Sequence, residues 1–273
     1  MIQPGVYTNL SSADYHNETS SISRSALIEF DRSPFHYWAR YLNPERPEKN
    51  ISSAMELGAA FHAMILEPEL FNAQYILKPE PVLLKDVGRE AYDRYKSELE
   101  ACENSGRIAI SMENFDILTS MRSRILNNPQ AYELLQGARI ENSFFWRDAE
   151  TELMLKARPD ALQKNIYIDL KSCTDGSPRA FQSSMVAGGY HVQAAMTQEA
   201  VLKTEGHLIE NFIFIAVETK YPYSVAIYIL DDVALEAGRE KFRSLVYDLA
   251  QCLKNNEWPG YGIMNVSLPK WAL

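Results

Sequence analysis

The pattern of hydrophobic and polar positions changes character at Arg139. Before Arg139, apolar residues recur at the three-to-four spacing of helices with one buried face. Irregular chain is expected over residues 6–22, and the polar stretch from Asn43 to Ser52 predicts a loop. Five helices are expected in this part. The first follows an N-cap at Ser23, and the second follows Ser33-Pro34 and runs to Tyr41. The other three are expected over Ala54–Leu66, 86–103 and 112–136.

After Arg139, short strand segments follow one another quickly. Strands are expected over Ile140–Arg147, Glu152–Lys156, Arg158–Leu162, Ile166–Lys171, Asn211–Glu218 and Tyr223–Leu230. Helices are expected over Phe181–Lys203, with an interruption at Gly188-Gly189, and over Val233–Lys254. The almost continuous apolar run from Asn211 to Glu218 is typical of a central strand covered on both faces.

This order of elements predicts an α/β fold with a central mixed sheet flanked by helices and an N-terminal helical elaboration. We expect a single domain, 1–273, in which residues 1–138 are mainly helical and residues 139–273 contain the sheet.

Asp160, Asp169 and Lys171 are the main chemical signal in the sequence. In the strand that follows a turn at residues 163–165, Asp169 and Lys171 are two positions apart and therefore share a face. Asp160 precedes the turn, so a neighbouring strand can bring it alongside them. Two carboxylates and an ammonium can hold a divalent cation and organise a water for attack on phosphate, which is nuclease chemistry. Each part also has an ordinary explanation, as a surface ion pair or as turn chemistry.

Four further polar residues are candidates for the same site. His62, on an expected helix, is either a core histidine or a metal ligand. Glu141 is either a strand-end charge or a carboxylate that faces the metal from an adjacent strand. Gln193 is either a surface residue or a group that orients a phosphate or the attacking water. Ser172 is either a strand-end hydroxyl or a phosphate contact.

Ser23, Arg24 and Ser25 stand at a helix start, where free backbone amides and the positive end of the helix dipole favour anions. Capping explains the serines without any function. It does not explain Arg24, because a cation is mildly unfavourable at a helix N-terminus. This segment is therefore a candidate phosphate site.

Composition narrows the functional class. The net charge of −9 argues against broad coating of DNA, and a DNA enzyme of this charge needs a divalent metal between its carboxylates and the phosphates. Three scattered cysteines form neither a disulfide framework nor a zinc spacing. No apolar run is long enough to span a membrane, and no secretory signal is visible, so a cytoplasmic protein is expected.

With these residues in view, the chain resembles the RecE-type phage exonucleases, the exodeoxyribonuclease VIII family of the PD-(D/E)XK nuclease superfamily. The blocks that carry the resemblance are Ser23-Arg-Ser-Ala-Leu27, Leu57 to Phe71, Arg158-Pro-Asp160, Asp169-Leu-Lys-Ser172, Tyr190-His-Val-Gln193, Glu257-Trp-Pro259 and Ser267-Leu-Pro-Lys-Trp271.

The resemblance implies a role for each matching position. His62, Asp160 and Asp169, with the Leu170 carbonyl, match the metal-binding positions, and Lys171 matches the catalytic lysine. Gln193 matches a glutamine of the family. Relatives often carry a tyrosine four residues further on, where this chain has Thr197. The role of that tyrosine is either absent here or taken by Tyr190, which we count among the DNA-contacting candidates.

The resemblance also implies an activity. This is Mg²⁺-dependent degradation of linear double-stranded DNA from its ends, 5′ to 3′, with Mn²⁺ as a substitute metal. The product is a 3′ single-stranded tail for a single-strand annealing protein (RecT-like) in DNA recombination. A homo-oligomeric ring, a tetramer or trimer, and the cytoplasm of a bacterial host are implied as well. Two alternatives stay open: an endonuclease or single-strand nuclease of the same superfamily, and a non-catalytic DNA-end-binding recombination factor.

Overall fold

The computed structural model describes residues 2–47 and 52–268. Its strands are β1 (Gly5–Tyr7), β2 (Tyr75–Leu77), β3 (Ile108–Ile110), β4 (Arg139–Ile140), β5 (Ser143–Arg147), β6 (Met154–Ala157), β7 (Ala161–Gln163), β8 (Ile166–Cys173), β9 (Asn211–Glu218) and β10 (Val225–Ile229). Its helices are α1 (Ser12–Asn17), α2 (Arg24–Arg32), α3 (Pro34–Tyr37), a π-helical turn η1 (Trp38–Leu42), α4 (Ser53–Leu66), α5 (Pro68–Gln74), α6 (Leu84–Val87), α7 (Arg89–Glu103), α8 (Met112–Leu126), α9 (Pro129–Leu135), α10 (Pro178–Gly188), α11 (Tyr190–Glu205) and α12 (Asp232–Asn255).

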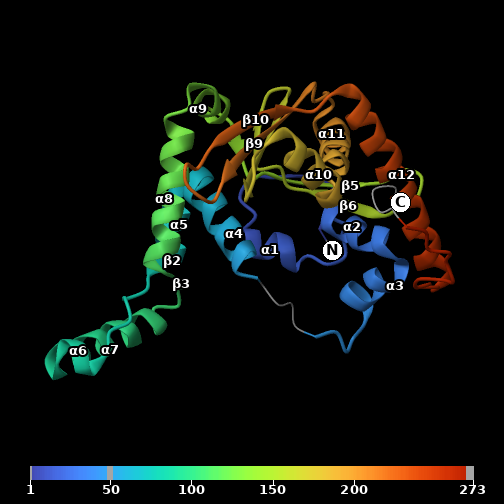
Figure 1. The fold of residues 1–273 in the computed structure, drawn as a ribbon. Coiled ribbons are helices and arrows are strands. Elements are labelled where there is room, and N and C mark those ends of the chain that lie inside the picture. The colour runs from blue at the N-terminus through green and yellow to red at the C-terminus, as the bar shows by residue number, and fades with distance from the viewer. Residues whose placement is uncertain (1, 48–51, 269–273) are drawn as a thin grey trace.

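Two sheets form the body of the molecule (Figure 1). The larger has the strand order β10-β9-β8-β7-β4, and in it β8 and β9 run parallel while the other neighbours are antiparallel. The smaller, β1-β5-β6, is antiparallel throughout. The expected α/β fold with a mixed sheet and flanking helices is therefore confirmed. Helices α6 and α7 project away from this body beyond the short β2–β3 pair (Figure 1). Within the described residues, no helix is both long and apolar enough to cross a membrane.

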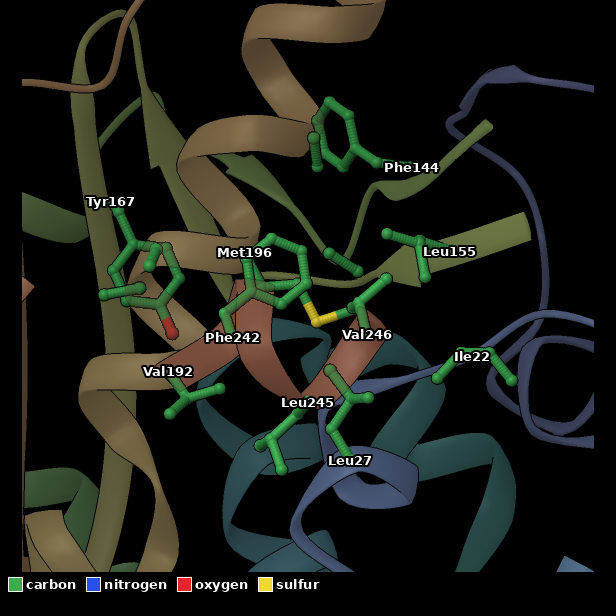
Figure 2. Packing of buried hydrophobic residues seen from close by; sticks show 14 of the residues in the cluster. Ile22, Leu27, Phe144, Leu155, Tyr167, Val192, Met196, Phe242, Leu245 and Val246 are labelled. Atoms are coloured by element: carbon green, nitrogen blue, oxygen red, sulfur yellow. The ribbon is translucent and has the colours of Figure 1, made fainter. Parts of the chain in front are cut away.

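Helices cover both faces of the larger sheet. On one face, Tyr167 of β8 and Phe214 of β9 pack with residues of α2, α11 and α12, as Figure 2 shows for Tyr167, Val192, Phe242 and Leu27. On the other face, Ile168 and Leu170 of β8 and Ile215 of β9 pack with Phe61 of α4 and Leu118 of α8. Burial on both faces explains why Asn211–Glu218 is almost continuously apolar, and the strand predicted there is confirmed.

The expected break at Gly188-Gly189 is also present. Gly189 has a φ of 63° and separates α10 from α11. Near the start of α11, a Cβ added at Gly238 of α12 would lie 2.2 Å from the carbonyl oxygen of His191. Only glycine lets the two helices approach this closely, and their contact fixes α11 over the sheet.

Several predicted boundaries are wrong for identifiable reasons. Residues 6–22 are not irregular, because β1 pairs with β5 and α1 is capped by Ser11; both elements are too short to show a period. The helix expected over 112–136 is divided at Asn128-Pro129, since proline lacks the N–H that a helix interior needs. The strand expected over Ile140–Arg147 is divided at Glu141, which has a φ of 51°.

Smaller differences affect other elements. The helix expected over 86–103 is interrupted by Gly88, whose φ is 79°. The strand expected from Arg158 begins only at Ala161, which leaves Arg158 and Asp160 just outside the sheet ladder. The block from Ser267 to Trp271 extends into residues 269–271, which lie outside the described part of the chain.

Candidate active site

The β7–β8 hairpin brings Asp160 to the strand that carries Asp169. β7 ends at Gln163 and β8 begins at Ile166, so the predicted turn is present, and Ala161 lies opposite Ile168. Oδ2 of Asp160 accepts a hydrogen bond of 2.6 Å from the backbone N–H of Leu170. The predicted approach of Asp160 to the second acid is therefore confirmed, and this bond fixes the orientation of the Asp160 carboxylate.

His62 and Glu141 converge on Asp160 from two other elements. One ligand atom from each of the three side chains lies within 4.8 Å of the others, a separation that suits a shared metal ion. His62 projects from α4, and its Nδ1 is 3.4 Å from Oδ1 of Asp160. We call His62, Glu141 and Asp160 the metal trio. Two carboxylates and an imidazole are a donor set that divalent transition metals and Mg²⁺ accept.

Backbone geometry places Glu141 in the metal trio. Its N–H donates a 3.1 Å hydrogen bond to the carbonyl oxygen of Asp160, and its positive φ turns the chain between β4 and β5. Its side chain is held by Arg158, whose Nε donates a 2.6 Å hydrogen bond to Oε2. Glu141 thus meets Asp160 from the adjacent strand segment, in the arrangement that the sequence left as one of two possibilities.

Asp169 lies beside the metal trio in a different environment. Its side chain is fully buried, and Oδ1 accepts hydrogen bonds from the Tyr167 hydroxyl at 2.7 Å and from Nε2 of Gln193 at 2.8 Å. Nζ of Lys171 forms a close ion pair with Oδ2. The Lys171 ammonium also lies 4.7 Å from the centre of the Tyr190 ring, a cation–π distance. Asp169 and Lys171 therefore share a face of β8, as predicted.

The electrostatics of the metal trio favour a cation. Burial raises the pKa of Glu141 to about 7, and the neighbouring Asp160 carboxylate adds to this rise against the opposing effect of Arg158. Burial also acts to raise the pKa of Asp160, but His62, Lys171 and the Leu170 N–H together hold that pKa below its ordinary value. Burial lowers the pKa of His62, yet Asp160 outweighs burial and raises it overall. A divalent cation would favour the two ionised carboxylates and would take the place of the proton on His62 as their counter-charge.

Two buried oxygens beside the metal trio differ in their partners. Oδ2 of Asp169 is paired with the Lys171 ammonium, whereas Oε1 of Gln193 has no hydrogen-bond partner among the described residues. Burial, first, and the nearby Asp160 raise the pKa of Asp169, whereas Lys171 lowers it. An unpartnered buried oxygen is uncommon and fits a metal-coordinated water. The residues present therefore fit a divalent metal.

The other predicted site residues have their own contacts in the fold. Ser23 caps α2, with its hydroxyl accepting from the Ala26 N–H, and Ser25 is exposed. Nη1 of Arg24 donates a 2.7 Å hydrogen bond to the carbonyl oxygen of Gly188, so Arg24 ties α2 to the end of α10. Ser172 approaches α4, since a Cβ added at Gly58 would lie 3.5 Å from its hydroxyl. Thr197 is buried.

Sequence reasoning missed two residues of the site. Tyr167 shares the strand face of Asp169 and Lys171, and period two alone would have placed it there. Alternation gave Tyr167 a face but no role; its ring packs in the core, and its hydroxyl donates a hydrogen bond to Asp169. Arg158 was noted only as part of a motif. No local pattern links it to Glu141, which is 17 residues away and meets it only through the β5–β6 hairpin.

A parallel strand pair, β8–β9, and the antiparallel neighbour β7 thus bring Asp160 to the Asp169-Leu-Lys171 sequence. The family model described as a PDDEXK-like domain of unknown function (DUF3799) matches residues 23–266. The chain belongs to this family. The expected PD-(D/E)XK fold class is confirmed, whereas the finer expectation of a RecE-type exonuclease stays a prediction.

One solved structure shares the fold of this chain. A protein from Eubacterium rectale, described provisionally as an exonuclease, matches over 94% of this chain and 96% of its own, with a TM-score of 0.60 and 15% identity. At this identity the match shows a shared fold. An alkaline exonuclease from Laribacter hongkongensis matches over 72% of this chain and 97% of its own, with a TM-score of 0.30 and 12% identity, and this weaker likeness carries no argument. No curated protein is significantly similar to the chain.

Proposed function

We propose that this protein is a divalent-metal-dependent exonuclease that degrades linear double-stranded DNA from its ends, with Mg²⁺ as the metal and Mn²⁺ as a substitute. The observation that carries the proposal is the meeting of the metal trio with the Asp169–Lys171 pair at one place. Membership of the PDDEXK-like family and the fold shared with a provisionally assigned exonuclease support it.

In this proposal, His62, Glu141 and Asp160 hold the metal, and Asp169, with the Leu170 carbonyl, completes the protein ligands. When bound, the cation lowers the pKa of a coordinated water and offsets the charge that develops on the phosphate. The contact between Lys171 and Asp169 must loosen for Asp169 to take part, because the ammonium covers Oδ2.

The remaining residues orient the reacting groups. Lys171 orients or deprotonates the attacking water, and its ammonium steadies the charge on the phosphate. The Tyr190 ring below that ammonium limits where Lys171 can move. Gln193 donates to Asp169, and its Oε1 has no partner within residues 2–47 and 52–268, so this oxygen is available to accept from the water. Ser23, Arg24, Ser25 and Ser172 remain proposed phosphate contacts.

The decisive experiment is digestion of a linear duplex labelled at the 5′ or the 3′ end, with Mg²⁺, beside a covalently closed circle. Asp169→Ala serves as the inactive variant. Asp116→Asn, an exposed acid of α8, serves as the matched control. Loss of the linear duplex from its 5′ strands, with the circle intact and Asp169→Ala inactive, is the expected result.

Other outcomes select the alternatives. Cutting of the circle would move the protein to the endonucleases, and cutting of single strands alone would make it a single-strand nuclease. Absence of metal-dependent cutting on every substrate would favour a non-catalytic DNA-end-binding factor. The Asp160, Asp169 and Lys171 set argues against that last alternative, because a protein that only binds DNA ends does not need all three.

The wider setting follows from the family resemblance. A 5′ to 3′ polarity would leave a 3′ tail for a RecT-like annealing protein during phage recombination in a bacterial cytoplasm. A ring of three or four copies would encircle the duplex. Sedimentation velocity would test the ring, and a population that stays monomeric at micromolar concentration would contradict it.

A further inference from the structure

Arg158 is a buried cation next to the metal trio, and it donates to three acceptors in two separate parts of the chain. Its side chain is only 8% exposed. Besides the 2.6 Å bond from Nε to Glu141, its Nη1 donates to the Leu10 carbonyl oxygen at 2.9 Å and to the Ser143 hydroxyl at 3.0 Å. A planar guanidinium can satisfy three such acceptors at fixed angles, whereas an ammonium on a flexible stem cannot hold the same geometry.

The chain from Thr8 to Glu18, here called the N-terminal segment, packs against Arg158. Its Tyr15 is buried, and the ring centre lies 5.6 Å from Cζ of Arg158 and 4.6 Å from Nζ of Lys156. Lys156 also donates to the backbone carbonyls of Tyr15, at 2.6 Å, and of Glu18. Two cations at the end of β6 therefore fasten the N-terminal segment, and the segment excludes water from Arg158.

Strand register explains why Arg158 reaches Glu141. Phe144 of β5 lies opposite Ala157 of β6, so Arg158, the residue just after β6, comes beside Ser143 at the start of β5. Glu141 lies two residues before Ser143, at the same end of this hairpin. The smaller sheet thus delivers an acid together with its own counter-ion to the site, while the larger sheet delivers Asp160 and Asp169.

We propose that Arg158, buried beneath the N-terminal segment, is a positioning residue that holds the Glu141 carboxylate in reach of the metal bound by His62 and Asp160. The inference rests on the proposed function and deepens it. By occupying Oε2, Arg158 restricts rotation of the carboxylate and leaves its other oxygen toward the metal. The N-terminal segment, which looks irregular in sequence, is then part of the support of the metal site rather than a peripheral extension.

The test is a double-mutant cycle on Mn²⁺ affinity, measured by isothermal titration calorimetry on the full chain without DNA. The variants are Arg158→Lys, Glu141→Gln and the pair together. The control is Arg147→Lys on β5, whose arginine is 54% exposed and bonds the Glu152 carbonyl oxygen. Arg158→Lys should weaken Mn²⁺ binding by about 10- to 100-fold, as loss of a supporting partner does at other metal sites, with an unchanged circular dichroism spectrum. Arg147→Lys should leave it unchanged.

The cycle separates positioning of Glu141 from general damage. In the Glu141→Gln background, Arg158→Lys should cause little further loss, because the group that it positions is gone. An equal loss in both backgrounds, or wild-type Mn²⁺ affinity in Arg158→Lys, would overturn the inference while leaving the proposed nuclease intact. Absence of Mn²⁺ binding by the wild-type chain would overturn both.

If Arg158→Lys does not fold, Ser143→Ala provides a second test. It removes one acceptor of Arg158 and should weaken Mn²⁺ binding a few-fold. Unchanged Mn²⁺ affinity in Ser143→Ala would contradict the inference.

Discussion

The metal trio and the buried Asp169 lie side by side in this site, and their surroundings differ. The metal trio keeps contact with solvent, since the side chains of His62 and Glu141 are 28% and 18% exposed. Its members converge on one another, and a single cation would serve all three. Asp169 is fully buried, and Tyr167, Gln193 and Lys171 already surround its carboxylate.

Under the proposed function, the difference would set an order in which the groups take part. The metal trio would hold a metal while the Lys171–Asp169 pair stays intact, whereas Asp169 would become a ligand only if Lys171 left Oδ2. Lys171 would then be free to orient the water or the phosphate. Charge exchange of this kind would couple metal binding to activation of the lysine, and the variants below are chosen to separate the two groups.

The largest effect should come from Asp160→Asn. Asp160 contacts His62 of the metal trio and also accepts from the N–H of Leu170, the residue next to Asp169. Losing several kcal/mol of transition-state stabilisation lowers the rate by about 1,000-fold or more. Mn²⁺ titration and duplex digestion should both fail. Retention of either one at near wild-type level would remove Asp160 from the proposed chemistry, and Asp116→Asn gives the baseline.

Lys171→Gln should change cleavage and metal binding in different ways. Cleavage should fall by about 100-fold or more, as when a group that assists proton transfer is lost. Mn²⁺ affinity should be unchanged or higher, because the ammonium no longer competes for Oδ2 of Asp169. Calorimetry and single-turnover cleavage measure the two quantities separately. Lys164→Gln, in the exposed β7–β8 turn, is the matched control. Weaker Mn²⁺ binding in Lys171→Gln would contradict the exchange described above.

The pH dependence of metal binding should depend on Glu141. Because the pKa of Glu141 in the metal-free protein is raised to about 7, the carboxyl holds a proton below that pH, and the metal must displace it. One competing proton lowers the affinity by about tenfold for each pH unit below 7. Asp160 raises the pKa of His62, so a proton on His62 also competes with the metal, and Glu141→Gln should reduce the slope of log Kd against pH by about one proton rather than to zero.

The same raised pKa has a consequence for stability. The protonated form of Glu141 is the favoured one in the folded, metal-free chain, so its contribution is present below the ordinary pKa of 4.5 and is lost as the pH rises through about 7. Glu141→Gln should therefore raise the Tm of the metal-free protein at pH 8. Saturating Mn²⁺ should reverse the order, because only the wild-type carboxylate gains from the metal.

The smallest effect should come from Tyr167→Phe, which removes one hydrogen bond to Asp169 and leaves the packed ring in place. The free energy of unfolding should fall by about 1–2 kcal/mol, the usual contribution of a buried hydrogen bond to a carboxylate. Urea denaturation measures this loss, with the exposed Tyr247→Phe as control. Cleavage should fall less than in Lys171→Gln; an equal fall would give Tyr167 a direct role.

Local sequence determined the parts of this protein that depend on periodicity and on turn chemistry. Alternation along Ile166–Lys171 placed Asp169 and Lys171 on one face, and the turn at residues 163–165 brought Asp160 beside them. The continuous apolar run at Asn211–Glu218 predicted a strand buried on both faces, and the glycines at 188 and 189 predicted a helix break. These features need only neighbouring residues, so the fold class and the core of the site could be inferred without coordinates.

Tertiary structure alone decided which distant residues meet. Glu141 had two explanations in the sequence, and only the turn at its positive φ and the β5–β6 register place it against Asp160 and Arg158. The N-terminal segment gave no periodic signal, because its elements are held by Lys156 and Arg158 from far along the chain. Periodicity reports the face of one element, whereas contacts between elements depend on register and close approach, which no single stretch of sequence encodes.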